Sequence, residues 1–401
     1  MIVPTMNAND YMHINRTALR LAGLYPVSIF RCTVCILCLF LIIVPQVAQI
    51  YRHQDNLNSV LETSSVLFTI TLALLKSIVW IISRREIEFF INYMLTDYGR
   101  LVPSDDAVEQ LIVYATLISI HHTLKGYARN VTKGYFFLIC NSLIFFFSLP
   151  MIDKLIFILK GSKDSSSSKN FPFLAWYPNL CYDFPYYELI YISQLVATGI
   201  CGLMILAVDT LIVTALLHTS GHFKVLQKEL EDLDININQV CTGLFLGIGS
   251  IVKHHQRVLW FCDKMEMNFS PMLLLQTLAS SLIICLIALQ VSTTLTDRAK
   301  ILKYLSYLVM ALFQLVMFCF PGDILLQQSF AVNKAAYSIR WYDTAALLRD
   351  EVSLLILRAQ RPSQVTAGGF YVMHLENFNM VLSTAASYFM LIRNINMENS
   401  R

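Results

Sequence analysis

The stretch TAGGFYVMHLENFNMVLSTAASYFMLIRNI, from Thr366 to Ile395, places a glycine pair before an apolar helix close to the end of the sequence. A water-soluble domain rarely puts so hydrophobic a helix there. The composition of the whole chain explains it, because 56% of the 401 residues are hydrophobic and only 14% are charged. Soluble proteins carry about 25% charged residues. We therefore expect lipid to be the solvent for part of this chain.

Seven stretches of the sequence are long and apolar enough for membrane helices, which need about 20 such residues. They are residues 32–51, 63–82, 134–151, 186–217, 267–296, 304–322 and 370–392. The sequence therefore predicts an all-α membrane protein with seven transmembrane helices. An odd number of spans puts the two ends of the chain on opposite sides of the bilayer. The distribution of Lys and Arg leaves open which side is which.

Two long amphipathic segments lie between the spans, on the same side of the predicted bilayer. One begins at Ser104, a candidate helix N-cap. The other, residues 332–361, carries leucines among charged residues, at Leu347, Leu348, Leu354, Leu355 and Leu357. Such a stripe needs an apolar partner. We expect spans four to six to continue beyond the lipid and to pack there with the segment before Pro362.

Motifs for catalysis or metal binding are weak in this sequence, so we expect neither an enzyme nor a cofactor. His121-His122 and His254-His255 are the obvious candidates. Adjacent helical residues point about 100° apart, so neither pair is suited to hold one metal ion. The formal net charge of +3 gives no basis for nucleic-acid binding.

Two stretches together indicate a family. The first is HHQRVLWFCDKMEMNFSPMLLLQ, from His254 to Gln276, and the second is the opening stretch with its TAGGFY lead, its LENF and its closing SYFMLIR. Both resemble insect odorant receptors. The resemblance implies a subunit of a tetrameric, odorant-gated, non-selective cation channel in the plasma membrane of an olfactory neuron dendrite. It places the N-terminus in the cytoplasm and the C-terminus outside.

The resemblance also implies a partner, because an odour-specific subunit of this family assembles with a shared co-receptor into a heterotetramer. The co-receptor has an extended loop between spans four and five, whereas residues 218–266 form a short connection here. This chain therefore resembles a tuning subunit, which binds a small apolar volatile ligand while cations permeate the assembled pore.

The family layout divides the chain into five parts. These are a cytoplasmic N-terminal segment (1–31), transmembrane helices one to six with the odorant pocket in their outer half (32–322), a cytoplasmic amphipathic anchor helix (323–365), a pore-lining seventh helix (366–395) and an extracellular C-terminus (396–401).

In the family, odorants bind between spans two, three, four and six, which are rich in aromatic residues here. The residues expected to contact ligand are Phe68, Leu72, Asn141, Phe145, Phe146, Leu149, Tyr187, Tyr191, Leu195, Tyr304, Tyr307 and Met310. Such a lining binds a small apolar molecule by desolvation with few directional bonds. Taken singly, each aromatic is better explained by lipid contact or helix packing, so the prediction rests on the region rather than on any one residue.

The last helix lines the pore in the family. Thr384, Ser387, Leu391 and Ile395 share one helical face with spacings of three or four residues. The two hydroxyl residues are suited to a wet pore, and an apolar ring closes a pore by dewetting. The resemblance places Leu391 at the constriction and Ile395 near its outer rim. Gly368-Gly369 is expected to break the chain ahead of this helix.

Two other classes of receptor fit a seven-helix chain. A G-protein-coupled receptor is disfavoured because span three lacks an Asp-Arg-Tyr end and span seven lacks Asn-Pro-x-x-Tyr. A gustatory-type channel, which opens without a co-receptor, is disfavoured because its closing sequence pattern is absent. The matched broken helices typical of a transporter are also missing.

Overall fold

The computed structural model describes residues 13–97, 107–159, 171–236, 241–294, 298–339, 341–343 and 346–399. Its helices are α1 (His13–Leu21), α2 (Ile29–Arg52), α3 (Leu57–Ile82), α4 (Arg84–Asp97), α5 (Ala107–Leu159), α6 (Tyr186–Asn236), α7 (Cys241–Thr293), α8 (Arg298–Ser338), α9 (Ala346–Ala359) and α10 (Leu375–Asn399). Two 3₁₀ turns, Asn179–Tyr182 and Trp341–Asp343, and two short strands, β1 (Thr366–Ala367) and β2 (Tyr371–Val372), complete the described elements.

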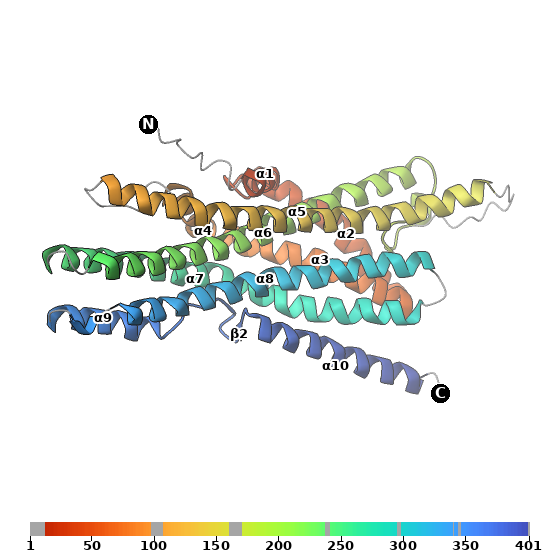
Figure 1. The fold of residues 1–401 in the computed structure, drawn as a ribbon. Helices are drawn as coiled ribbons and strands as arrows, with labels where there is room; N and C mark the ends of the chain where they lie inside the picture. The colour runs from red at the N-terminus through yellow and green to blue at the C-terminus, as the bar shows by residue number, and fades with distance from the viewer. Residues whose placement is uncertain are drawn as a thin grey trace.

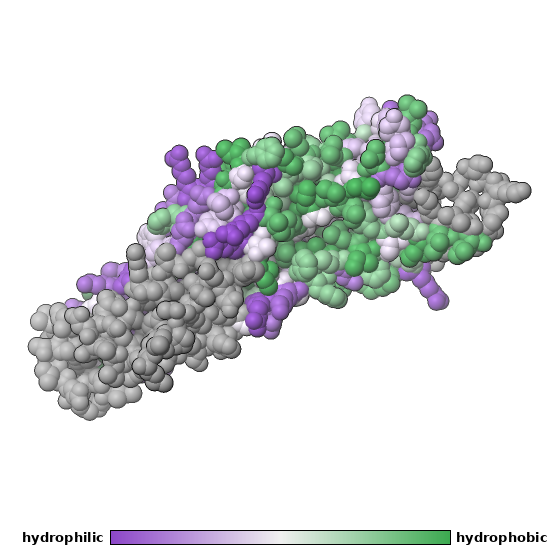
Figure 2. Space-filling model, turned by 90° about the horizontal axis from the view of Figure 1, so that it is seen from above, coloured by the Kyte–Doolittle hydropathy of each residue, from purple (hydrophilic) through white to green (hydrophobic). Residues whose placement is uncertain are grey.

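The helices lie side by side in one elongated bundle (Figure 1). Helix α6 is the central element, since it contacts α1, α2, α3, α5, α7 and α8 and buries most of its apolar stretch. Helices α2, α3, α5, α6, α7 and α8 each contain a segment long and apolar enough to cross a membrane. Figure 2 shows apolar side chains gathered in a band on one face, with hydrophilic side chains on both sides of it. The chain is therefore a helical membrane protein.

Helix α10 has 25 residues, which is long enough to cross a membrane, but its sequence is less apolar than those of the six helices above. Its sequence carries Ser383, Thr384, Ser387 and Arg393 among the apolar residues. Lipid penalises such side chains, whereas a water-filled path tolerates them. The seventh span therefore stays a prediction, and its polarity suits a helix that is only partly exposed to lipid.

The long helices extend past any single bilayer. Helices α6 and α7 have 51 and 53 residues, which at 1.5 Å per residue makes each about 75–80 Å long. The hydrocarbon core is about 30 Å thick. At the end where α2, α3 and α10 are absent, α6, α7 and α8 continue and α9 packs on α7 and α8 (Figure 1). The predicted extension of spans four to six beyond the lipid is thus present.

Several predicted boundaries are wrong. Residues 323–365 do not form one helix, because α8 continues to Ser338 and α9 begins only at Ala346. The helix of the third span, predicted for 134–151, does not end there, since α5 includes Pro150 and continues to Leu159. On α9, Leu355 is buried while Leu354 and Leu357 are exposed. Ser104 and the side chains of Leu347 and Leu348 lie outside the described residues.

The last helix also begins later than predicted, at Leu375 rather than Phe370. Strands β1 and β2 pair antiparallel ahead of it. Gly368 and Gly369 form their turn with φ angles of 65° and 78°, a region that side chains other than glycine's rarely adopt. The chain break predicted at this glycine pair is confirmed.

The β1–β2 hairpin is fixed to α7 by hydrogen bonds. The backbone N–H of Thr366 donates to Glu266 Oε2 over 2.8 Å, and the Thr366 hydroxyl donates to the other oxygen of this carboxylate. The N–H of Gly368 donates to Ser270 Oγ over 2.9 Å. Because α10 follows this hairpin directly, its starting point is set by α7.

Helix α8 approaches the hairpin so closely that only glycine fits at residue 322. A Cβ atom there would lie 2.1 Å from the backbone oxygen of Met373. We predict that Gly322→Ala lowers the thermal stability of the detergent-solubilised protein by several degrees, since overpacking costs about 1–3 kcal/mol. The control Gly199→Ala, where a Cβ atom meets nothing within 4 Å, should leave the melting temperature unchanged or slightly raised. Equal melting temperatures for the two variants would contradict the close approach.

Candidate ligand-binding site

Five helices enclose a cavity of about 90 Å³ in the apolar part of the bundle. By the same measure one water molecule needs roughly 10–15 Å³, so the cavity has room for a small organic molecule. Helices α3, α5, α6, α7 and α8 all contribute to the lining, and Phe173 enters from the connection between α5 and α6. Most of the lining is apolar.

Each helix faces the cavity with one stripe of residues. On α5 the stripe is Tyr135, Ile139, Ser142 and Phe146, spaced by three or four residues. This is the spacing of one helical face. Helix α8 repeats it with Tyr307, Met310, Ala311 and Gln314. The cavity is therefore a consequence of how the helices are rotated about their axes.

Aromatic rings form one wall of the cavity. Phe146 meets Tyr307 edge to face with ring centres 5.8 Å apart, and it stacks on Phe173 at 5.0 Å. The Lys303 ammonium lies 4.5 Å from the centre of the Phe146 ring and 2.6 Å from Glu62 Oε1. This ion pair joins α8 to α3 beside the aromatic wall.

Phe173 is held in the lining by Gln194 of α6. The Phe173 N–H donates to Gln194 Oε1 over 3.2 Å, and Gln194 Nε2 donates to the Phe173 carbonyl over 3.3 Å. The neighbouring N–H of Trp176 donates to Pro45 O on α2. Burial raises the pKa of the Tyr177 hydroxyl, so this group stays protonated beside Gln194. The connection thus forms a fixed cover over the cavity.

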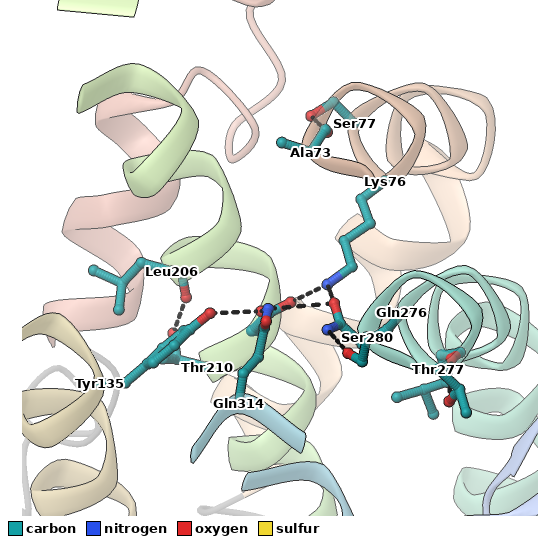
Figure 3. A network of polar contacts seen from close by, with 12 residues as sticks. Ala73, Lys76, Ser77, Tyr135, Leu206, Thr210, Gln276, Thr277, Ser280 and Gln314 are labelled. Atoms are coloured by element: carbon teal, nitrogen blue, oxygen red, sulfur yellow. Dashed lines mark hydrogen bonds and ion pairs between the residues drawn. The ribbon is translucent and has the colours of Figure 1, made fainter. Parts of the chain in front are cut away.

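The opposite boundary of the cavity is a buried polar network (Figure 3). Lys76 Nζ lies 2.5 Å from both Asp209 Oδ1 and Gln276 Oε1. The other carboxylate oxygen, Asp209 Oδ2, accepts hydrogen bonds from Gln314 Nε2 at 2.7 Å and from the Tyr135 hydroxyl at 3.2 Å. The five residues come from α3, α6, α7, α8 and α5 respectively, so one network ties together every helix of the cavity.

The buried ion pair of this network is stable only if the polar atoms around it are all hydrogen-bonded. Lys76 and Asp209 are 1% and 0% exposed. Burying an ion pair costs several kcal/mol per ion, and the pair is tolerated where hydrogen bonds satisfy the remaining polar atoms. Here two helices donate to the Asp209 carboxylate and a glutamine accepts from the lysine. Lys76 therefore faces protein rather than lipid or water.

Of the residues predicted to contact ligand, Leu72, Phe146, Tyr307 and Met310 line the cavity. The others lie outside the lining, so their ligand contact stays a prediction; they are Phe68, Asn141, Phe145, Leu149, Tyr187, Tyr191, Leu195 and Tyr304.

Among these others, Phe68 and Leu195 are exposed on the apolar surface, whereas Asn141, Phe145 and Leu149 are half-buried on α5. Tyr187 is buried against Phe171. The Tyr191 hydroxyl donates to the Phe147 carbonyl over 2.7 Å.

Sequence reasoning missed Tyr135, Gln314, Ser280 and Phe173 as lining residues. The available signal was the pair of charged residues inside predicted spans, Lys76 and Asp209, because an ion within a membrane protein needs polar partners. Two of those partners, Tyr135 and Gln314, line the cavity. Phe173 carried no comparable signal, since a loop residue is placed only by the tertiary structure.

The predicted pore residues lie along one side of α10. Its buried residues Val381 and Ala385 face the bundle, while Thr384, Ser387 and Leu391 are exposed in the single chain. The side chain of Ile395 lies outside the described residues.

Histidines elsewhere contact each other and acids rather than forming a metal site. His254 Nδ1 lies 3.0 Å from Glu229 Oε2, and His218 and His222 approach each other at 3.0 Å between their Nε2 atoms. Within the described part of the chain, no group of three or more metal-ligating side chains is arranged to hold an ion. The side chains of His121 and His122 fall outside that part.

These features define a class of protein: a helical membrane protein with a largely apolar cavity between its spans. Residues 56–386 match the family model described as 7tm Odorant receptor. The chain belongs to this odorant receptor family, a family of receptors rather than enzymes, and the resemblance noted in the sequence is confirmed.

Individual relatives agree with this assignment. Odorant receptor 67c of Drosophila melanogaster is 30% identical over 231 residues, which cover 56% of this chain and 55% of that protein. Odorant receptor 30a of the same species is 23% identical over 386 residues, which cover 94% of this chain and 91% of that protein. The olfactory receptor OR5 of Machilis hrabei, solved in complex with eugenol, has a TM-score of 0.79 over 96% of this chain and 100% of that one, at 17% identity. This structural likeness shows a shared fold.

Filling the cavity tests whether it is the binding site. Ala311 lines the cavity and is buried, so the ring in Ala311→Phe must occupy the ligand's space. We predict at least a tenfold loss of sensitivity to activating odorants, measured as dose–response currents, with normal surface expression. In the control Val196→Phe, the same ring is added at an exposed position of α6, and sensitivity should be kept. Wild-type sensitivity in Ala311→Phe would contradict the assignment.

Proposed function

We propose that this chain is the odour-specific subunit of an odorant-gated, non-selective cation channel in the plasma membrane of olfactory neuron dendrites. The observation that carries the proposal is the largely apolar cavity between α3, α5, α6 and α8. These helices contain predicted spans two, three, four and six, the region that binds odorant in the family. A relative of the same fold was solved with eugenol, a small aromatic volatile.

The lining suits a ligand of this kind. A small volatile that buries about 250 Å² of apolar area at ~25 cal/mol per Å² gains roughly 6 kcal/mol. That free energy corresponds to a dissociation constant of some tens of micromolar. Affinity of this order is adequate for a reversible sensor, and the aromatic wall of Phe146, Phe173 and Tyr307 offers a surface on which such a molecule can stack.

The pore in this proposal is built from α10 helices of several subunits. In the single chain the side of α10 that carries Thr384, Ser387 and Leu391 has no cover. A ring of such helices would place hydroxyl groups along a wet path and leucines in an apolar collar, from which water withdraws when the pore narrows. Ile395 is proposed for the outer rim. Arg393, which is also exposed, is proposed to point away from the pore axis.

Gating follows if the ligand binds the open arrangement more tightly than the closed one, since only differential affinity shifts such an equilibrium. Helix α7 is the natural link, because Ser280 and Ile283 line the cavity and Glu266 and Ser270 of the same helix hold the β1–β2 hairpin. A shift of α7 is thereby transmitted to the start of α10. The remaining subunits are proposed to be the shared co-receptor.

Expression in oocytes tests the proposed function. We predict odorant-evoked cation currents when this chain is expressed with an insect odorant co-receptor, and none when it is expressed alone. The currents should persist when G-protein signalling is blocked, because the conducting pore is part of the complex. Currents from the chain alone would favour a gustatory-type channel, and loss of the response on blocking G proteins would favour a coupled receptor.

The gate is tested by polar substitution on α10. We predict that Leu391→Asn raises the ligand-independent leak current several-fold, since a wettable ring no longer excludes water. Met390→Asn is the matched control, because Met390 is equally exposed on the same helix but points about 100° away. Leak currents that are equal in the two variants, or unchanged in Leu391→Asn at normal surface expression, would argue against the gate.

A further inference from the structure

We propose that Gln314 determines the ligand specificity of the cavity: its side-chain carbonyl accepts a hydrogen bond from a ligand hydroxyl or N–H group. The receptor would then prefer alcohols, phenols and amines over ethers of the same shape. This inference rests on the proposed function of the cavity as the odorant site, and it adds the chemical class of the ligand.

The orientation of the Gln314 amide is fixed by its neighbours. Its Nε2 atom lies 2.7 Å from Asp209 Oδ2 and 3.3 Å from Gln276 Oε1, and both of these atoms are acceptors. The two amide hydrogens are therefore both donated to the network. A flipped amide would turn its carbonyl oxygen toward the Asp209 carboxylate, where the two would repel. Only the carbonyl is left for a ligand.

That carbonyl oxygen is available on the cavity side. Gln314 lines the cavity, and within the described part of the chain its Oε1 atom has no hydrogen-bond partner and is not among the side-chain atoms sealed from solvent. An acceptor left without a partner in a dry site costs free energy. A ligand donor removes that cost, whereas an ether oxygen in the same place adds a repulsion.

Most other polar groups of the lining are hydrogen-bonded within the protein, including Ser280 Oγ, which accepts from Gln276 Nε2 over 2.8 Å. The hydroxyls of Thr69 and Tyr307 bond to each other and to the Ser65 carbonyl. Thr198 Oγ1 donates to Gln194 O over 2.6 Å, and the Tyr135 hydroxyl donates to Asp209. Ser142 is the main competing group, since it also lines the cavity.

Lys76 and Asp209 are positioning residues in this arrangement. Neither lines the cavity, but Asp209 Oδ2 holds the Gln314 amide while Lys76 holds Oδ1 of the same carboxylate. Replacing one charge alone leaves the other buried and unpaired, which destabilises the fold. Replacing both by apolar residues of similar size avoids that penalty but releases Gln314 to rotate.

The experiment measures dose–response currents of the full chain with its co-receptor for matched pairs, each an alcohol or phenol and its methyl ether. Benzyl alcohol with benzyl methyl ether, and 4-ethylphenol with 4-ethylanisole, are suitable probes within a broad odorant panel. The wild type should favour the hydroxyl compound about tenfold, the value of one buried hydrogen bond. Gln314→Met should bring the ratio near one while the ether keeps its potency within about threefold.

Two controls separate specificity from folding. Ser77→Ala removes a buried hydroxyl one residue from Lys76 that donates to Ala73 O on its own helix, and it should keep the tenfold preference. The double variant Lys76→Met/Asp209→Leu should reach the cell surface and lose the preference, although Gln314 is intact. It also provides an independent readout if Gln314→Met fails to fold.

The outcomes are distinct. Equal potency of each wild-type pair, a preference that survives in Gln314→Met, or a preference abolished by Ser142→Ala would overturn the role of Gln314 and leave the proposed function standing. The absence of any odorant-evoked current from a correctly expressed complex across the panel would contradict the proposed function itself.

Discussion

The Lys76–Asp209 ion pair is the constraint around which the rest of the bundle is arranged. Two charges with 1% and 0% exposure are tolerated only where polar groups surround them. Those groups come from α5, α7 and α8, so the relative rotation of five helices is fixed at one level. The same rotation turns the apolar stripes of these helices toward a common space, and the cavity lies directly beside the pair.

Helix α7 relates the cavity to the proposed pore. One part of it lines the cavity, and another holds the hairpin that precedes α10. Helix α8 packs closely against the end of the same hairpin, because Gly322 has no side chain and the Met373 backbone can approach it. The start of α10 is thus determined by two helices that also line the cavity. A small change of packing around the cavity therefore has a direct route to the last helix.

Much of the fold could be predicted from the sequence. Five of the seven predicted spans fall within single helices of the structure, and the other two, 267–296 and 370–392, overlap α7 and α10 for most of their length, because a run of about 20 apolar residues has few alternatives in lipid. Boundaries were less predictable. Pro150 lies inside α5, because proline is tolerated within membrane helices, and the hairpin at 366–372 moves the start of the last helix from the predicted Phe370 to Leu375. Leu72, Phe146, Tyr307 and Met310 were foreseen as residues that line the cavity, whereas Tyr135, Gln314 and Phe173 were not.

The sequence by itself determined that this chain is a helical membrane protein of the odorant receptor family, because apolar length and a few local motifs are properties of neighbouring residues. It also placed two charged residues, Lys76 and Asp209, inside predicted spans. Only the tertiary structure decided that they are each other's partners across 133 positions of the chain, and which side chains line the cavity. The rotation of each helix about its axis is set by contacts between segments that are distant in the sequence. The hydrophobic pattern of one helix does not indicate which neighbouring helix each of its faces will contact.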